Sequence, residues 1–140
     1  MDDLEAAVKT HRFIRNRRRT NVRPREESIQ GHWKRRYLAH GVLSNTLREG
    51  RILDLCRELL GPQINRVTVN KNLCCHPHRD KANDDDSYIC WFGDFTGGAL
   101  CLETGERFEG KRKWFKFNGK TTTHWNEEHE GGKFACVAYS

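Results

Sequence analysis

The sequence predicts an α+β protein that is mainly β, with helices toward the N-terminus that support the sheet. Three observations carry this prediction. Apolar residues recur every three or four positions between residues 44 and 60, and every second position from Ile64 onward. Glycine-containing turns separate the later apolar stretches. The length of 140 residues allows one modest domain with one core.

Residues 44–60 form the strongest helix prediction. Their apolar side chains fall on one face, Ser44 or Asn45 can cap the first turn, and a Gly-Pro pair ends the helix. Residues 1–19 have a weaker helical spacing that an arginine-rich end interrupts. We therefore expect one well-defined helix and a second, less regular one before the strands begin.

From Ile64 onward, the chain predicts a series of short strands separated by turns. Several short strands with regular turns imply a sandwich or barrel behind the helices. We expect residues 1–43 to form a basic, partly helical N-terminal segment, and residues 44–140 to form a helix and a β core within a single domain. After the strand that begins at Ile64, the candidate strands are residues 87–92, 99–103, 113–117 and 133–139.

Positive charge is concentrated in the N-terminal half. Residues 1–70 carry 15 Lys and Arg against 8 Asp and Glu, whereas residues 71–140 carry 10 against 11. Residues 11–36 alone hold ten basic and two acidic side chains. This block favours a polyanionic partner such as DNA, the alternative being a solvated arm. Trp33 and Tyr37, which lie among these bases, suit contact with nucleic acid or packing on the core equally well.

The composition argues against a membrane or a disulfide-rich protein. The longest apolar run has six residues, whereas a bilayer-spanning helix needs about 20, and the N-terminus lacks the pattern of a secretory signal. The six cysteines include the adjacent Cys74 and Cys75 and form no C-x-x-C pair, which argues against a disulfide framework and a zinc finger. We expect an intracellular protein, nuclear if the host is a eukaryote and cytoplasmic otherwise.

His78 and Asp80 form a His-x-Asp motif directly after a predicted strand. Positions i and i+2 of an extended stretch point to the same side, so both side chains can bind one metal ion. His124 lies 44 residues beyond Asp80 and supplies a third ligand. Two histidines and a carboxylate leave three positions of an octahedral ion open, which a non-haem Fe(II) oxygenase uses for a chelating co-substrate and O2.

Lys133 follows the second histidine by nine residues and opens the last predicted strand. A cation there can pair with the distal carboxylate of 2-oxoglutarate while the keto-acid end chelates the metal. The alternative is a surface lysine on an edge strand, in which case Arg112, Lys116 and Lys120 are the remaining candidate cations. His129 is expected in a solvated loop.

These elements, in this order, resemble the 2-oxoglutarate/Fe(II)-dependent dioxygenase superfamily. The closer resemblance is to the TET/JBP-like branch, whose members oxidise the 5-methyl group of pyrimidines in nucleic acid. The resemblance covers residues 64–140 and implies a double-stranded β-helix, or jelly roll. It rests on residues 64–72, His76-Pro77-His78-Arg79-Asp80 with Asn83, residues 91–100, and the late segments Asn118-Gly119, His124-Trp125 and Glu130-Gly131-Gly132-Lys133-Phe134.

The resemblance implies that His78, Asp80 and His124 ligate a catalytic Fe(II), which binds 2-oxoglutarate and O2. It also implies that Lys133 binds the co-substrate carboxylate. The family usually has an arginine at this position, and a lysine supplies the charge without the planar fork.

Two further residues are candidates on the substrate side. Asn83 matches a family asparagine that helps to hold the target base, or it caps a turn. His76 could orient a metal ligand, or it is an ordinary loop residue.

The expected function is the Fe(II)- and 2-oxoglutarate-dependent oxidation of the 5-methyl group of a pyrimidine in DNA, with 5-methylcytosine favoured and thymine second. The first alternative is the same chemistry on a protein side chain or a small molecule. The second is a non-catalytic nucleic-acid-binding module that kept the fold.

Overall fold

The computed structural model describes residues 1–19, 22–23, 41–80, 83 and 85–140. Within these ranges the chain is mainly β, with two helices and antiparallel sheets, an architecture compatible with a β-sandwich. The predictions made for Trp33, Tyr37 and residues 24–36 of the basic block lie outside the described residues.

The largest element is a six-stranded sheet in which every neighbouring pair of strands is antiparallel. The C-terminal strand lies in the interior of this sheet, because it pairs along its length with β4 on one side and with β6 on the other. In order across the sheet, the strands are β1 (Arg15–Asn16), β3 (Val42–Leu47), β4 (Arg66–Lys71), β13 (Phe134–Tyr139), β6 (Ser87–Phe92) and β10 (Phe115–Phe117).

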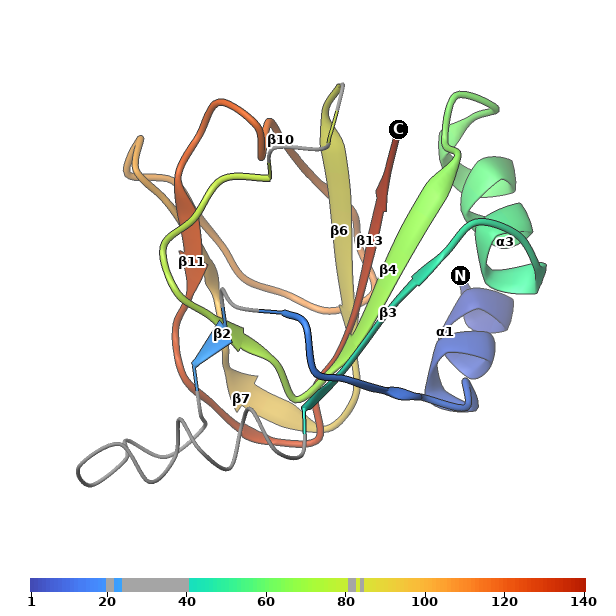
Figure 1. Cartoon of the computed structure of the whole chain (residues 1–140), viewed down its shortest axis with the longest axis horizontal. Helices are drawn as coiled ribbons and strands as arrows, with labels where there is room; N and C mark the ends of the chain where they lie inside the picture. Colours follow the sequence, from blue (N-terminus) through green and yellow to red (C-terminus); the bar gives the residue numbers. More distant parts are fainter. Residues whose placement is uncertain (20–21, 24–40, 81–82, 84) are drawn as a thin grey trace.

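One face of this sheet is covered by two helices, α1 (Asp2–Lys9) and α3 (Arg51–Leu60) (Figure 1). Successive side chains of a strand point to opposite faces, so every second residue of the central strands meets the helices. These residues are apolar, and together with the buried faces of the helices they form one core cluster. The strand residues of this cluster are Val67, Val69, Cys90, Phe92, Cys136 and Ala138, and the helix residues are Leu4, Val8, Ile52, Leu53, Leu55 and Cys56.

The opposite face is covered by three small antiparallel sheets (Figure 1). A second apolar cluster packs Leu100 and Leu102 of one small sheet against Ile89, Trp91, Phe117 and Ala135 of the main sheet. The small sheets pair β11 (His124–Asn126) with β8 (Leu100–Leu102) and β8 with β9 (Arg107–Phe108), β12 (His129–Gly131) with β7 (Phe95–Gly97), and β2 (Val22–Arg23) with β5 (Cys74–Cys75).

The prediction of one helix over residues 44–60 is wrong in its first part. Strand β3 runs through Leu47, and the helix begins only at Arg51, after Gly50 with a φ of 101°. Strand β3 pairs with β4 over five residue pairs, from Leu43 with Lys71 to Leu47 with Val67. This long-range pairing overrides the local helical spacing, and Ser44 lies within a strand rather than at a helix cap.

The other predicted elements are confirmed in outline, the strand at 87–92 with the predicted bounds and the rest with shorter ones. The helix expected within residues 1–19 ends at Lys9, and the arginine-rich part that follows includes strand β1. The strand expected from Ile64 begins at Arg66, and the strand expected at 133–139 begins at Phe134. Neither described helix is long and apolar enough to cross a lipid bilayer.

Candidate metal centre

Two histidines and one aspartate meet on the face of the main sheet that carries the small sheets. The backbones of His78 and His124 form an antiparallel bridge, in which each N–H donates to the other residue's carbonyl oxygen at 3.0 Å. The backbone N–H of Asp80 donates to the carbonyl oxygen of Gly119 at 2.7 Å. Backbone hydrogen bonds therefore bring His124 beside two ligands that lie more than 40 residues earlier in the sequence.

Both imidazole rings are oriented by carbonyl oxygens two residues earlier in the chain. His78 Nδ1 lies 2.6 Å from the oxygen of His76, and His124 Nδ1 lies 2.9 Å from the oxygen of Thr122. A carbonyl oxygen only accepts, so each Nδ1 carries a proton and donates it. The Nε2 atom of each ring is thereby directed to the centre of the site, as metal-binding histidines require.

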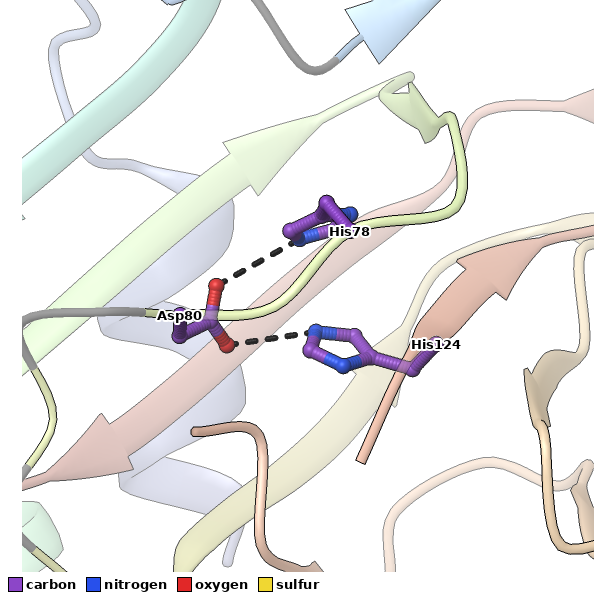
Figure 2. Close-up of side chains that lie close together, drawn as sticks. All are labelled: His78, Asp80 and His124. Atoms are coloured by element: carbon purple, nitrogen blue, oxygen red, sulfur yellow. Dashed lines mark ion pairs between the residues drawn. The ribbon is translucent and has the colours of Figure 1, made fainter. Parts of the chain in front are cut away.

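Asp80 lies beside both rings and faces the Nε2 atom of each (Figure 2). Its Oδ1 is 3.4 Å from His78 Nε2, and its Oδ2 is 3.2 Å from His124 Nε2. The three ligand atoms lie within 4.8 Å of one another, so these residues could hold a metal ion. Burial alone would raise the pKa of Asp80, but the hydrogen bonds and charges of His124 and His78 hold that pKa below its ordinary value.

Gly119 provides the space that the carboxylate occupies. A Cβ atom at this position would lie 2.5 Å from Asp80 Oδ2 and 3.2 Å from His124 Cε1. Any larger residue would therefore displace the aspartate or the second histidine. The glycine of the Asn118-Gly119 turn thus leaves the space in which Asp80 and His124 meet.

The three residues line a cavity of about 430 Å³, a volume within the usual range of small-ligand sites. The cavity floor is the face of the main sheet that the helices do not cover. Strands β3 and β4 contribute polar side chains to it, whereas β13 and β6 contribute mainly apolar ones. The polar floor residues are Thr46, Thr68 and Asn70, and the apolar ones are Ile89, Trp91, Ala135 and Val137.

Lys133 lines this cavity and is only 2% exposed. Its Nζ finds no hydrogen-bond partner among the residues that the structure describes. Burial lowers the pKa of its amine, and the nearby Cys74 and Cys75 partly oppose that shift. Burying an ammonium without a partner costs folding free energy. An anion bound in the cavity would therefore stabilise the charged form of this group.

The two candidates for the substrate side lie in different surroundings. Asn83 is buried and lines the cavity, and its Nδ2 donates to Ser87 Oγ at 2.9 Å. Its backbone N–H donates to the carbonyl oxygen of Asp80 at 3.3 Å. The side chain of His76 is exposed, and the carbonyl oxygen of this residue orients His78.

The three other candidate cations are exposed and line no part of the cavity. Arg112 pairs with Asp2 and Glu5 of helix α1, and Lys116 pairs with Asp86. The expectation that His129 lies in a solvated loop is wrong. This residue lies in strand β12, where pairing with β7 buries its side chain.

Sequence reasoning missed several cavity residues. The alternation of β4 could have indicated Thr68 and Asn70. Val67 and Val69 pack into the core, so the residues between and after them point to the opposite face, where the cavity lies. No sequence signal distinguishes Arg19, which also lines the cavity, from the neighbouring arginines.

Comparison of the sequence with protein families and with curated proteins identifies no relative of this chain. A scan against models of protein families finds no match, and a search of curated proteins finds no significant match.

Proposed function

We propose that this protein is an Fe(II)- and 2-oxoglutarate-dependent dioxygenase. One observation carries the proposal: the His78, Asp80 and His124 ligand atoms converge within 4.8 Å at the wall of a cavity that also contains the buried amine of Lys133. A set of metal ligands and an ammonium without a hydrogen-bond partner among the described residues, both in one cavity, are what a chelating dianion needs.

The donor set fits iron. Two imidazoles and one carboxylate are the protein ligands of many non-haem Fe(II) oxygenases, in which the other positions stay open for co-substrate and O2. Bound Fe(II) would supply the activation of O2, coupled to the oxidative decarboxylation of 2-oxoglutarate to succinate and CO2.

The chain's own residues hold and orient these groups. The Nδ1–H bonds of His78 and His124 leave the lone pair of each Nε2 for the metal. Asp80 contributes an anionic oxygen and stays ionised across the neutral range, since its pKa is lowered. The Lys133 amine balances the distal carboxylate, and Trp91 with Phe117 gives the cavity apolar walls that exclude water.

The proposal extends to the fold. The main sheet and the small sheets enclose the cavity between two antiparallel layers. Such layers suit a double-stranded β-helix with the metal ligands near its open end. The residues with which this chain resembles the TET/JBP-like branch support the same assignment.

For the substrate, we propose the 5-methyl group of a pyrimidine in DNA, with 5-methylcytosine before thymine. Arg12, Arg15, Arg17 and Arg18 are exposed on the N-terminal segment, where they can contact phosphates. A base must leave the duplex stack to reach a metal ion that is bound inside a cavity. Asn83, with its amide in the cavity wall, is placed to contact such a base.

The compartment is part of the same proposal. All six cysteines are free thiols, five of them buried. Free thiols and an Fe(II) centre both suit a reducing interior, so we propose an intracellular protein.

The test is turnover of duplex DNA that carries 5-methylcytosine or only thymine, with Fe(II), 2-oxoglutarate and O2. Succinate is measured together with the digested nucleosides by mass spectrometry. We expect succinate and a hydroxymethyl pyrimidine in equal amounts. Succinate formed only with a protein or small-molecule substrate would overturn the DNA assignment and keep the chemistry. Loss of all 2-oxoglutarate turnover would favour a binding module.

Asp80→Ala is the variant that tests the metal assignment. It removes one of three ligands, and we expect no detectable turnover in a protein that keeps its fold. Asp54→Ala is the matched control, because Asp54 is an exposed acid on helix α3 that pairs with Arg57. Turnover by Asp80→Ala at the level of the control would show that the metal lies elsewhere.

A further inference from the structure

The C-terminal half of the chain contains three arginines, which differ in their position relative to the cavity. Residues 71–140 hold Arg79, Arg107 and Arg112, and all three side chains are exposed. Of these three, Arg79 lines the cavity of the candidate metal centre and the other two do not. A side chain that is 53% exposed and also lines the cavity lies where the cavity opens to solvent. Arg79 is therefore a cation at the entrance of the cavity.

The two arginines away from the cavity are neutralised within the protein. Arg107 donates from Nε and Nη2 to the two carboxylate oxygens of Glu127 at 2.7 and 2.8 Å, and from Nη1 to Glu109 at 2.6 Å. Arg112 pairs with two acids of helix α1. Each of these guanidinium groups thus faces two carboxylates and has a structural partner for its charge.

The guanidinium of Arg79 has fewer and longer contacts. Its Nε donates to Thr123 Oγ1 at 3.2 Å, and its Nη2 donates to Glu103 Oε1 at 3.4 Å. The pair with Glu103 is exposed on both sides, and surface pairs of this kind contribute little to stability. These contacts use two of the five N–H donors of a guanidinium. The Nη1 atom makes no hydrogen bond to any residue that the structure describes.

The contacts of Arg79 fix its guanidinium beside the metal ligands. Thr123 directly precedes His124, and its backbone is paired with Glu103: the N–H of Glu103 donates to the carbonyl oxygen of Thr123 at 2.9 Å, and the N–H of Thr123 donates to Glu103 Oε1 at 3.1 Å. Arg79 therefore joins the His-x-Asp segment to the strand that contains the third ligand. A planar group that is held at Nε and Nη2 keeps its Nη1 in a defined place at the entrance.

The chemistry of this position fits a phosphate. A guanidinium binds phosphate oxygens through parallel hydrogen bonds in one plane. The metal ligands and the buried amine of Lys133 lie within the cavity, so a cation at its entrance meets the part of a substrate that stays outside. When a base leaves the DNA stack and enters a pocket, its own backbone remains at the mouth of that pocket. The anions closest to Arg79 would then be the phosphates on either side of the target nucleotide.

We propose that Arg79 binds a phosphate that flanks the target nucleotide and so holds the DNA backbone while the base lies in the cavity. This inference rests on the proposed function and adds a requirement to it. The substrate needs a phosphodiester backbone, which a free nucleoside or a protein side chain lacks. The role differs from that of the exposed arginines of the N-terminal segment, which are not part of the cavity entrance.

The test is a binding cycle between protein and DNA variants. The full chain is loaded with Mn(II), which does not support turnover, and with 2-oxoglutarate. The first duplex contains one mismatched 5-methylcytosine, because a mismatched base leaves the stack at low cost. In the second duplex, uncharged methylphosphonates replace the two phosphates that flank this base. Fluorescence anisotropy measures both affinities. We expect Arg79→Gln to weaken binding of the first duplex by about 3- to 10-fold, and to bind the second duplex as the wild type does.

Arg107→Gln is the matched control, because it removes an exposed arginine that lies away from the cavity. It should leave both affinities at the wild-type level. Salt dependence provides a second measurement. For the first duplex, the slope of log affinity against log salt should be smaller by about 1 in Arg79→Gln, as expected for the loss of one phosphate contact. The Mn(II) affinity of Arg79→Gln should equal that of the wild type.

Three results would overturn the inference and leave the proposed function intact. The first is wild-type affinity of Arg79→Gln for the first duplex. The second is an equal loss on both duplexes, which would show that Arg79 does not contact the phosphates beside the target. The third is a loss of Mn(II) affinity, which would show that Arg79 supports the metal ligands instead. If the wild type bound neither duplex, the assignment of DNA as the substrate would itself fail.

Discussion

The two faces of the six-stranded sheet use the same strands for different purposes. The face toward the helices is apolar across β4, β13 and β6, and α1 and α3 cover it. The face toward the small sheets is half polar and borders a cavity of about 430 Å³. On β4, neighbouring residues separate the two environments, because Val69 meets the helices and Thr68 meets the cavity.

This difference places the larger apolar core on one face and the candidate metal centre on the other. Close-packed apolar side chains contribute to the free energy of folding in proportion to the area that they bury. Side chains such as Asn70 and Lys133, which line the cavity, instead leave polar atoms available to a ligand. Substitutions on the two faces should therefore have separable effects, and the following experiments test that separation in order of expected size.

The largest effect should come from Phe92→Ala on the helix-facing side. Phe92 is fully buried in the first core cluster, and such a truncation costs about 3–5 kcal/mol of unfolding free energy. Urea denaturation measures this loss. Phe117→Ala is the comparison on the cavity side, where the lost ring enlarges a space that already exists. Equal losses for the two variants would contradict the division between the faces.

Gly119→Ala should act on the metal centre with little effect on stability. The new Cβ would lie 2.5 Å from Asp80 Oδ2 and displace that ligand. We expect Mn(II) affinity to fall by about 10- to 100-fold, the range seen when the support of a metal ligand is lost. Gly132→Ala is the control, because a Cβ there has no heavy atom within 4 Å. Wild-type metal affinity in Gly119→Ala would show that the site tolerates a shift of Asp80.

Lys133→Met should stabilise the protein while removing co-substrate binding. It replaces a buried ammonium, which has no hydrogen-bond partner within the described part of the chain, with an apolar side chain, and this is worth about 1–3 kcal/mol at pH 7. Burial lowers the pKa of Lys133 from its ordinary 10.5, so the charge opposes folding below the folded-state pKa. Between the folded-state pKa and 10.5, the unfolded chain binds more protons than the folded protein does. Wild-type stability should therefore rise with pH across this window, as the amine of the folded protein deprotonates. The gain in Lys133→Met, measured by urea denaturation, should therefore shrink toward pH 10, and a less stable variant at pH 7 would contradict the prediction.

The smallest effect should come from Thr68→Val on the cavity side of β4. The Thr68 hydroxyl is 3.0 Å from Thr46 Oγ1 and 3.2 Å from the Tyr139 hydroxyl, and both partners can instead bind water in the cavity. We expect a change in unfolding free energy below about 1 kcal/mol. The reverse exchange next to it, Val69→Thr, buries a hydroxyl against the helices and should cost about 1–3 kcal/mol. A larger loss for Thr68→Val than for Val69→Thr would reverse the assignment of the two faces.

The period of the apolar residues was a good guide wherever one face of a strand is buried. Val67 and Val69 predicted β4, and the run from residue 87 predicted β6 with its bounds as observed. The same reasoning failed over residues 44–50. The partner of β3 is a strand some twenty residues later, and the spacing of nearby apolar residues does not indicate such a pairing.

The candidate site was predictable where its residues are close in sequence. The His-x-Asp spacing predicted that His78 and Asp80 face one point, and the structure places His124 beside them. Arg19 could not be found in this way. Its neighbours have the same chemistry, and only the path of the N-terminal segment past Ser44 and Cys75 separates it from them.

The interior position of β13 has a consequence for how the molecule is made. Strands β4 and β6 both pair with this last strand, so each has an open edge on the ribosome until residue 139 has been synthesised. Open edges promote association between chains. Lys133 directly precedes β13 and is synthesised just before it, so the nascent chain completes its sheet and adds the buried cation of the cavity at the same stage. A chain truncated before this point would lose both together.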